Sequence, residues 1–210
     1  MHFSKTLEDD VEYSVVECTQ LDNNILLYKH KLDENQNHIV KLKSNQYALL
    51  FEEGKILDSI REEGMYTIKS EPNTSFPEDF CDYIIKNNKD KLCIIFFNLD
   101  IITNNKFYIK KKHKNNFYGD GSFDFQIENP LKLFNKVIEV RSYYSREELL
   151  EQIRERISKI VTSVIKKNKD EYIIEEVIHS SINVFKEYGI QIVSCDIKNI
   201  QFKKKIEKKY

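Results

Sequence analysis

The 210-residue sequence contains no tryptophan, three prolines and five glycines, and it lacks any long hydrophobic run. A transmembrane helix needs about 20 consecutive, mostly apolar residues. The first residues, MHFSKTLEDDVEYSVVE, also lack the apolar core and the cleavage site of a secretory signal peptide. We therefore expect a cytoplasmic protein, with any membrane contact being peripheral at the inner face.

An excess of charge of one sign is missing as well, because 33 basic residues stand against 34 acidic residues. No overall field then attracts nucleic acid or an anionic bilayer, so any such attraction has to be local. The four cysteines include no CxxC pair, which argues against a zinc ribbon and against a redox motif. Cys93 and Cys195 stand inside apolar runs and are expected to be buried thiols.

Recognisable catalytic and cofactor motifs are also absent from the sequence. It has no nucleophile elbow, no HExxH or HxxxH pair and no phosphate-binding glycine loop, and its five histidines form no motif. The two glycines of YGDGSF, residues 118–123, lack the spacing of a phosphate loop and are interpreted as a turn between strands. The sequence therefore predicts a protein that is not an enzyme and that holds no metal or cofactor.

Paired glutamates precede a glycine twice, at residues 52–54 and 62–64. Two carboxylates in a cleft can act as general acid and base. Apolar strand residues resume within two or three positions of each glycine, however, which is typical of tight turns in which glycine takes a positive φ. We interpret Gly54 and Gly64 as turns of a β-meander and the glutamates as solvated.

Residues 11–128 form the β-rich part of the chain. Short apolar bursts, several of them alternating with polar residues, are separated by Asn, Asp, Gly and Glu clusters. This pattern predicts an antiparallel or mixed sheet or a small barrel. The continuous apolar run Cys93–Phe97 predicts a strand that is covered on both faces.

Residues 129–202 change to a helical period and then return to a strand. Asn129 and Pro130 predict a helix start, and Ser145 begins a capping box ahead of a long apolar stripe. A third helix follows, Gly189 is predicted to stop it in a left-handed conformation, and residues 190–202 form a final strand. The fold class is therefore α+β, with a flexible N-terminus at 1–10 and a basic, helix-permissive tail at 203–210.

A basic run with aromatic neighbours, IKKKHKNNFYGD, is a candidate contact with an anionic surface. Its lysines are Lys110, Lys111, Lys112 and Lys114. Such a run can hold a nucleic-acid backbone, approach an anionic membrane, or serve as a solvated hairpin loop that protects an edge strand. The composition leaves these three interpretations open, and the solvated loop is favoured.

Several phrases occur in an order that resembles one known family. They are VVECTQLDNNILLYKH at 15–30, VKLKSNQYALLFEEGKILDSIREEGMYTI at 40–68, CIIFFN before Lys106 and Phe107, DGSFDFQIENPLKLFNKVI, the predicted helix from Ser145, and EYGIQIVSCDIKNIQF. The chain resembles SPFH domain (band 7) proteins, the relatives of stomatin, prohibitin and flotillin, over residues 11–202. It is most similar to their soluble bacterial branch, called virion core protein-like.

This resemblance implies a strongly bent sheet with packed helices and an oligomerising, membrane-associated scaffold without catalytic residues. Recruitment to the membrane would then depend on partner proteins or lipid-surface contacts, often in envelope stress responses. Two departures are evident, because KKKHKNNFYGDGSF replaces a glycine- and proline-rich stretch and the zinc ribbon of longer relatives is missing. The alternative is a nucleic-acid or phage-related binding module that uses the loop at 110–114.

Overall fold

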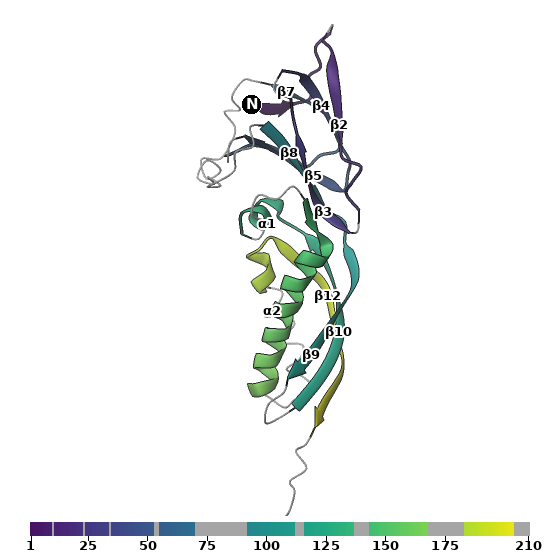
Figure 1. Ribbon diagram of the computed structural model, residues 1–210, viewed down its shortest axis with the longest axis vertical. Helices are drawn as coiled ribbons and strands as arrows, with labels where there is room; N and C mark the ends of the chain where they lie inside the picture. Colours follow the sequence, from purple (N-terminus) through teal and green to yellow (C-terminus); the bar gives the residue numbers. More distant parts are fainter. Residues whose placement is uncertain are drawn as a thin grey trace, which may run out of the picture. The chain divides into compact units, whose positions relative to one another are not determined.

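The computed structural model describes residues 1–9, 11–22, 24–33, 35–52, 55–69, 92–111, 116–136, 143–167 and 183–203. These residues form several β-sheets and packed helices, which confirms the predicted α+β class with antiparallel and mixed pairing (Figure 1). The chain divides into two compact units. Unit 1 comprises Met1–Asp100 and Pro130–Arg146, and unit 2 comprises Ile101–Asn129 and Glu147–Tyr210.

Unit 1 contains two sheets. The four-stranded sheet has the order β1 (His2–Ser4), β7 (Gly64–Lys69), β4 (Asn37–Leu42) and β2 (Tyr13–Glu17), in which β2 and β4 are parallel. The five-stranded sheet has the order β11 (Tyr143–Ser145), β3 (Ile25–Lys31), β8 (Leu92–Asn98), β5 (Gln46–Glu52) and β6 (Lys55–Ile60). All of its pairs are antiparallel.

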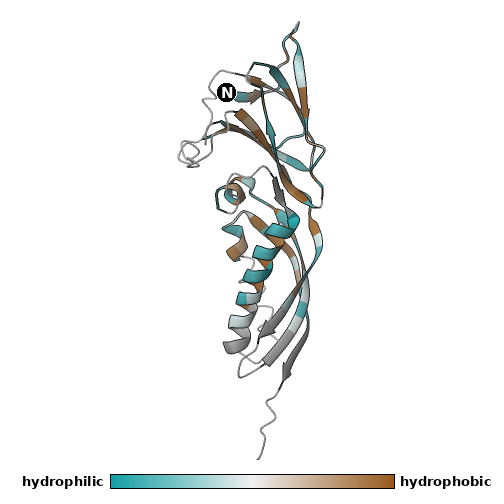
Figure 2. Cartoon of the chain, viewed as in Figure 1, coloured by the Kyte–Doolittle hydropathy of each residue, from teal (hydrophilic) through white to brown (hydrophobic). Residues whose placement is uncertain are grey.

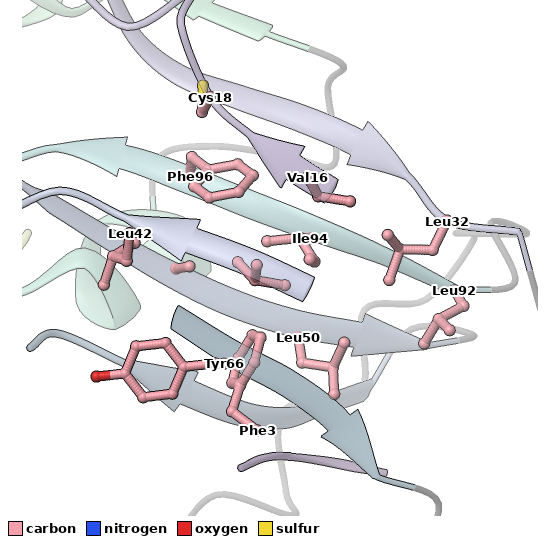
Figure 3. Close-up of a cluster of buried hydrophobic side chains, with 12 residues drawn as sticks. Phe3, Val16, Cys18, Leu32, Leu42, Leu50, Tyr66, Leu92, Ile94 and Phe96 are labelled. Carbon is pink, nitrogen blue, oxygen red and sulfur yellow. The ribbon is translucent and has the colours of Figure 1, made fainter. Parts of the chain in front are cut away.

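Apolar side chains from both sheets of unit 1 meet in one core (Figure 3). The four-stranded sheet contributes Val16 and Tyr66, and the five-stranded sheet contributes Leu50 and Phe96. Alternate residues of each strand point to the same face, so one residue in two reaches this core. Burial of these side chains between two sheets supplies the main favourable free energy of the unit.

The other face of the five-stranded sheet is covered by α1 (Pro130–Lys136). The ring of Phe134 packs edge-on against Phe51 at 5.9 Å and against Phe97 at 6.3 Å between centroids. Every residue of β8 is consequently buried. The prediction of a strand covered on both faces at Cys93–Phe97 is confirmed, and so is the helix start at Pro130.

In unit 2, the helix α2 (Arg146–Lys167) packs along a three-stranded antiparallel sheet. The strand order of this sheet is β12 (Ile190–Lys203), β10 (Asn116–Ile127) and β9 (Ile102–Lys111). The predicted helix start after Ser145 is confirmed, and its stripe buries Leu149, Ile153 and Ile157. Figure 2 shows hydrophilic residues along the visible side of α2. Residues 183–186 form a helical turn, while the rest of the predicted third helix lies outside the described residues.

Four local expectations need correction. The strands expected in one bent sheet are divided among three sheets in the described part of the chain. The N-terminus expected to be flexible contributes β1, because Phe3 joins the core. β6 and β7 belong to different sheets and form no meander. The glycines of YGDGSF lie inside β10, where Gly121 allows close packing against Phe107.

Candidate functional site

The outer face of the sheet in unit 2 is a polar surface. Along β10, Gly121, Phe123 and Phe125 are buried, whereas the alternate residues Asp120 and Ser122 are half-buried. Because successive strand residues point to opposite faces, the half-buried set shares one side of the sheet. We call this side the polar face. Its residues are Asp120, Ser122, Asp124 and Gln126 of β10, with their cross-strand partners Lys198, Asp196, Ser194 and Gln191 of β12 and Tyr108 and Lys106 of β9.

Asp124 joins all three strands of the polar face. Its Oδ2 accepts a hydrogen bond from the Ser194 hydroxyl of β12 at 2.8 Å, and its Oδ1 accepts one from the Asn104 backbone N–H of β9 at 2.7 Å. Asn104 has a φ of 59°, and it lies in a β-bulge where two residues of β9 oppose one of β10. Asparagine tolerates this left-handed conformation better than most residues. Asp124 therefore fixes both a bulge and a cross-strand contact.

An ion pair lies on β12 itself. Lys198 Nζ is 2.9 Å from Asp196 Oδ2, and the two side chains are 60% and 58% exposed. The hydrogen bond and charge of Asp196 raise the pKa of Lys198 above its ordinary value, so the lysine stays cationic. Both residues point toward solvent at the outermost strand of the sheet.

The two edges of this sheet differ. At β9, Arg154 of α2 donates its Nε–H to the Lys106 carbonyl oxygen at 2.8 Å, and Arg154 is held by an ion pair with Glu147. At β12, the only strand neighbour among the described strands is β10, and Val193 is 45% exposed. A side chain that occupies a backbone carbonyl hinders the addition of another strand at β9. The β12 edge is therefore the better candidate for interaction.

The predicted basic contact is described in part. Lys110 and Lys111 are the last two residues of β9, opposite Tyr118 and Phe117 of β10. Lys112 and Lys114 lie outside the described residues. β9 and β10 pair antiparallel on either side of this run, so the two described lysines belong to a hairpin.

The three predicted turn glycines have different places. Gly54 lies outside the described residues, between the paired strands β5 and β6. Gly64 is the first residue of β7, directly after a bend at Glu62 and Glu63. Gly189 has a φ of 73° and lies directly before β12, and its carbonyl oxygen accepts the backbone N–H of Glu128 at 3.0 Å.

Unit 1 contains a serine–histidine pair that no sequence motif indicates. The Ser14 hydroxyl and His38 Nδ1 are 2.7 Å apart, and His38 Nε2 is 2.8 Å from the Asp33 carbonyl oxygen. A carbonyl can only accept, so Nε2 carries a proton, and in the neutral imidazole Nδ1 accepts from the Ser14 hydroxyl. Hydrogen-bonded nucleophile–base pairs occur in catalysis, but here a backbone carbonyl, which carries no charge, orients the imidazole.

His38 also lines a pocket of about 290 Å³ together with Glu8, Tyr13 and Asp33. Its Ser14 partner is not among the lining residues. Parallel pairing of β2 with β4 places Ser14 directly beside His38, and the two residues are 24 positions apart in sequence. The hydrogen bonds therefore connect the edge strand β2 to the turn before β4, which is a structural role.

In the described part of the chain, no group of three or more His, Cys, Asp or Glu side chains could hold a metal ion. Within the same residues, no helix combines the length and the hydrophobicity needed to cross a bilayer.

The Cys195 thiol on β12 is half-buried and is expected to react slowly. Burial, and then the neighbouring Asp196 carboxylate, raise its pKa to about 11. The thiolate is the reactive form, so alkylation by iodoacetamide at pH 8 should be on the order of a hundredfold slower than for an ordinary thiol. In a Cys81→Ser chain, in which Cys18 and Cys93 are buried, the rate should rise steadily up to about pH 11. A rate that levels off near pH 9 would contradict this assignment, and guanidinium-unfolded protein is the control.

No protein-family model matches the sequence, and no curated protein matches it.

Proposed function

We propose that this chain is a non-enzymatic, self-associating scaffold of the SPFH type that is recruited to the cytoplasmic face of a membrane through partners. Its setting would be envelope or membrane organisation and stress. The observation that carries the proposal is the β12 edge, a strand of 14 residues with one neighbour among the described strands. A long, accessible edge can add a strand from another chain through backbone hydrogen bonds.

The charges of the polar face favour protein partners over direct binding to lipid. Acidic Asp120, Asp124 and Asp196 stand beside basic Lys106 and Lys198. An anionic membrane surface attracts clusters of basic residues and would repel the three carboxylates. Mixed charges instead suit a protein surface of complementary pattern, where they fix the register of the contact.

Light scattering coupled to gel filtration, liposome flotation and co-purification from cells would test the proposal together. We expect an oligomer whose mass depends on concentration, weak flotation with purified anionic liposomes, and retention of a membrane protein from cell extracts. A strict monomer that neither floats nor retains a membrane partner would contradict it.

A second candidate function is nucleic-acid binding by the hairpin of β9 and β10. It is favoured by the cross-strand pairing of Lys110 with Tyr118 and of Lys111 with Phe117, since cation and aromatic side chains together can hold a phosphate backbone and stack bases. Replacement of the four lysines at 110–112 and 114 by Ser should then abolish a salt-sensitive gel shift. Absence of a shift at low salt in the unmodified protein would exclude this function.

A further inference from the structure

We infer that two copies of this chain pair through β12, antiparallel and about a twofold axis at Ile197, so that Asp196 of each copy faces Lys198 of the other. This inference rests on the proposed self-association and specifies its surface and register. The contact would join the two three-stranded sheets into one continuous sheet of six strands, with the polar faces on the same side.

Strand geometry limits where such an axis can lie. In an antiparallel pair, two residues that face each other both direct their backbone groups toward the partner or both direct them away. Under twofold symmetry the axis must therefore pass through a residue position and not between two residues. A residue a given number of positions before the axis then faces the residue the same number of positions after it in the other copy.

The charges on β12 select one of these positions. An axis at Asp196 brings the two Asp196 carboxylates together, and an axis at Lys198 does the same for the two ammonium groups. An axis at Ile197 instead creates two pairs of opposite charge, because Asp196 and Lys198 flank it symmetrically. Opposite charges directly across a ladder stabilise it and like charges destabilise it, so the pattern specifies the register.

The same position suits the backbone of the strand. Asp196, Ile197 and Lys198 lie symmetrically about such an axis, within the part of β12 that pairs regularly with β10. Between Ser194 and Lys198 the pairing with β10 is regular, and register shifts lie on either side of this segment. Both shifts place the extra residue on β12 and disturb the edge locally, so the three regular residues at the axis, Asp196 to Lys198, should carry the contact.

Charge reversal in separate copies tests this register. Asp196→Lys gives a chain with lysine at both positions, and Lys198→Asp gives a chain with aspartate at both. Each variant alone should self-associate about tenfold to a hundredfold more weakly than the unmodified chain, because two attractive pairs become repulsive. An equimolar mixture should recover near-normal affinity in sedimentation velocity, as a dimer containing one copy of each.

The mixture separates a contact between copies from an effect within one chain. Mixing cannot restore the Asp196–Lys198 pair inside either variant, so recovery can come only from pairing between copies. Lys159→Asp is the matched control, since it makes the same change of charge and breaks an exposed ion pair with Glu155 on α2, outside the polar face, and it should leave self-association unchanged.

Three outcomes would overturn the inference. An oligomer that neither single reversal weakens would exclude this register and leave the proposed self-association intact. Weakening without recovery in the mixture would exclude the cross-copy pairs. A monomeric unmodified chain would contradict both proposals.

Disulfide trapping provides a second measurement that does not depend on affinity. In a Cys81→Ser background, Asp196→Cys and Lys198→Cys chains mixed under mild oxidation should give a covalent dimer, since facing residues have Cα atoms about 4.5 to 5.5 Å apart. Either chain alone should cross-link much less. Equal cross-linking of the separate chains and the mixture would contradict the register.

Discussion

A Gly121→Ala chain should lose about 3 kcal/mol of unfolding free energy and accumulate poorly as folded protein. A Cβ atom at this position would lie 2.4 Å from the Asp196 carbonyl oxygen of β12 and 2.4 Å from Phe107 Cζ of β9. The carbonyl belongs to the backbone of a paired strand and Phe107 is fully buried, so neither atom can move aside without disrupting the sheet. Chemical denaturation followed by circular dichroism would measure the loss.

The neighbouring substitution Ser122→Ala is the control for Gly121→Ala. Ser122 occupies the next position of β10 and lies on the polar face. Its replacement should change the unfolding free energy by no more than about 0.5 kcal/mol. A Gly121→Ala chain with the same midpoint as Ser122→Ala would show that β9 and β12 do not approach β10 as closely as described.

An Asn105→Asp chain should be destabilised by about 3 to 5 kcal/mol at neutral pH. Asn105 is buried, and its Nδ2 donates hydrogen bonds to the carbonyl oxygens of Ile102 at 2.8 Å and of Phe123 at 3.0 Å. A carboxylate at this position would bring negative charge against those two acceptors. The folded state would therefore favour the protonated acid and raise the pKa of the introduced side chain above its unfolded value of about 3.9.

The sign of the pH dependence follows from this raised pKa. Above about pH 4 the unfolded chain loses the proton while the folded chain retains it, so the destabilisation should grow with pH until the folded pKa is reached. Urea denaturation at pH 4 and pH 7 should show a smaller difference from the unmodified chain at pH 4. Asn105→Ala removes the donors without adding charge, so its loss should be the same at both pH values. A loss for Asn105→Asp that does not vary with pH would contradict this explanation.

Elements that depend on nearby residues were predictable from the sequence. α2 begins after Ser145 and buries Leu149, Ile153 and Ile157, because capping residues and helical spacing act over a few positions. The burial of β8 on both faces was equally predictable, since an unbroken apolar run requires cover on both faces. Residues 190–202 returned to strand character after Gly189 and form most of β12.

The division into sheets was not predictable, because it depends on pairings between distant residues. β6 and β7 follow each other in sequence but join different sheets, and β2 pairs parallel with β4. The Ser14–His38 hydrogen bond was not predictable either, because it depends on the pairing of β2 with β4. Gly121 was interpreted as a turn because glycine marks both turns and close contacts between strands, and only the positions of Phe107 and Asp196 distinguish them.

The candidate site at the β12 edge was only partly predictable from the sequence, because it also depends on pairings between distant strands. Asp196 and Lys198 are two positions apart in the predicted final strand, so the sequence alone places their charges on one face. Whether that face lies at an accessible edge depends on the strand order β12-β10-β9, which no local pattern encodes. The basic run at 110–114 was conspicuous by composition, but composition alone does not distinguish a solvated hairpin from a binding surface.

Segments of the two units alternate along the sequence, and this order constrains how the chain can fold during synthesis. The first segment of unit 1, residues 1–100, is synthesised before α1, which belongs to the same unit. Phe51 and Phe97 therefore cannot pack against Phe134 until the ribosome has passed residue 136. β9 and β10 can pair early as a hairpin, but β12 follows only after residue 190. Contacts so distant in sequence form slowly. The nascent chain therefore carries exposed strands through most of translation, and fragments cut at the midpoint should be prone to aggregate.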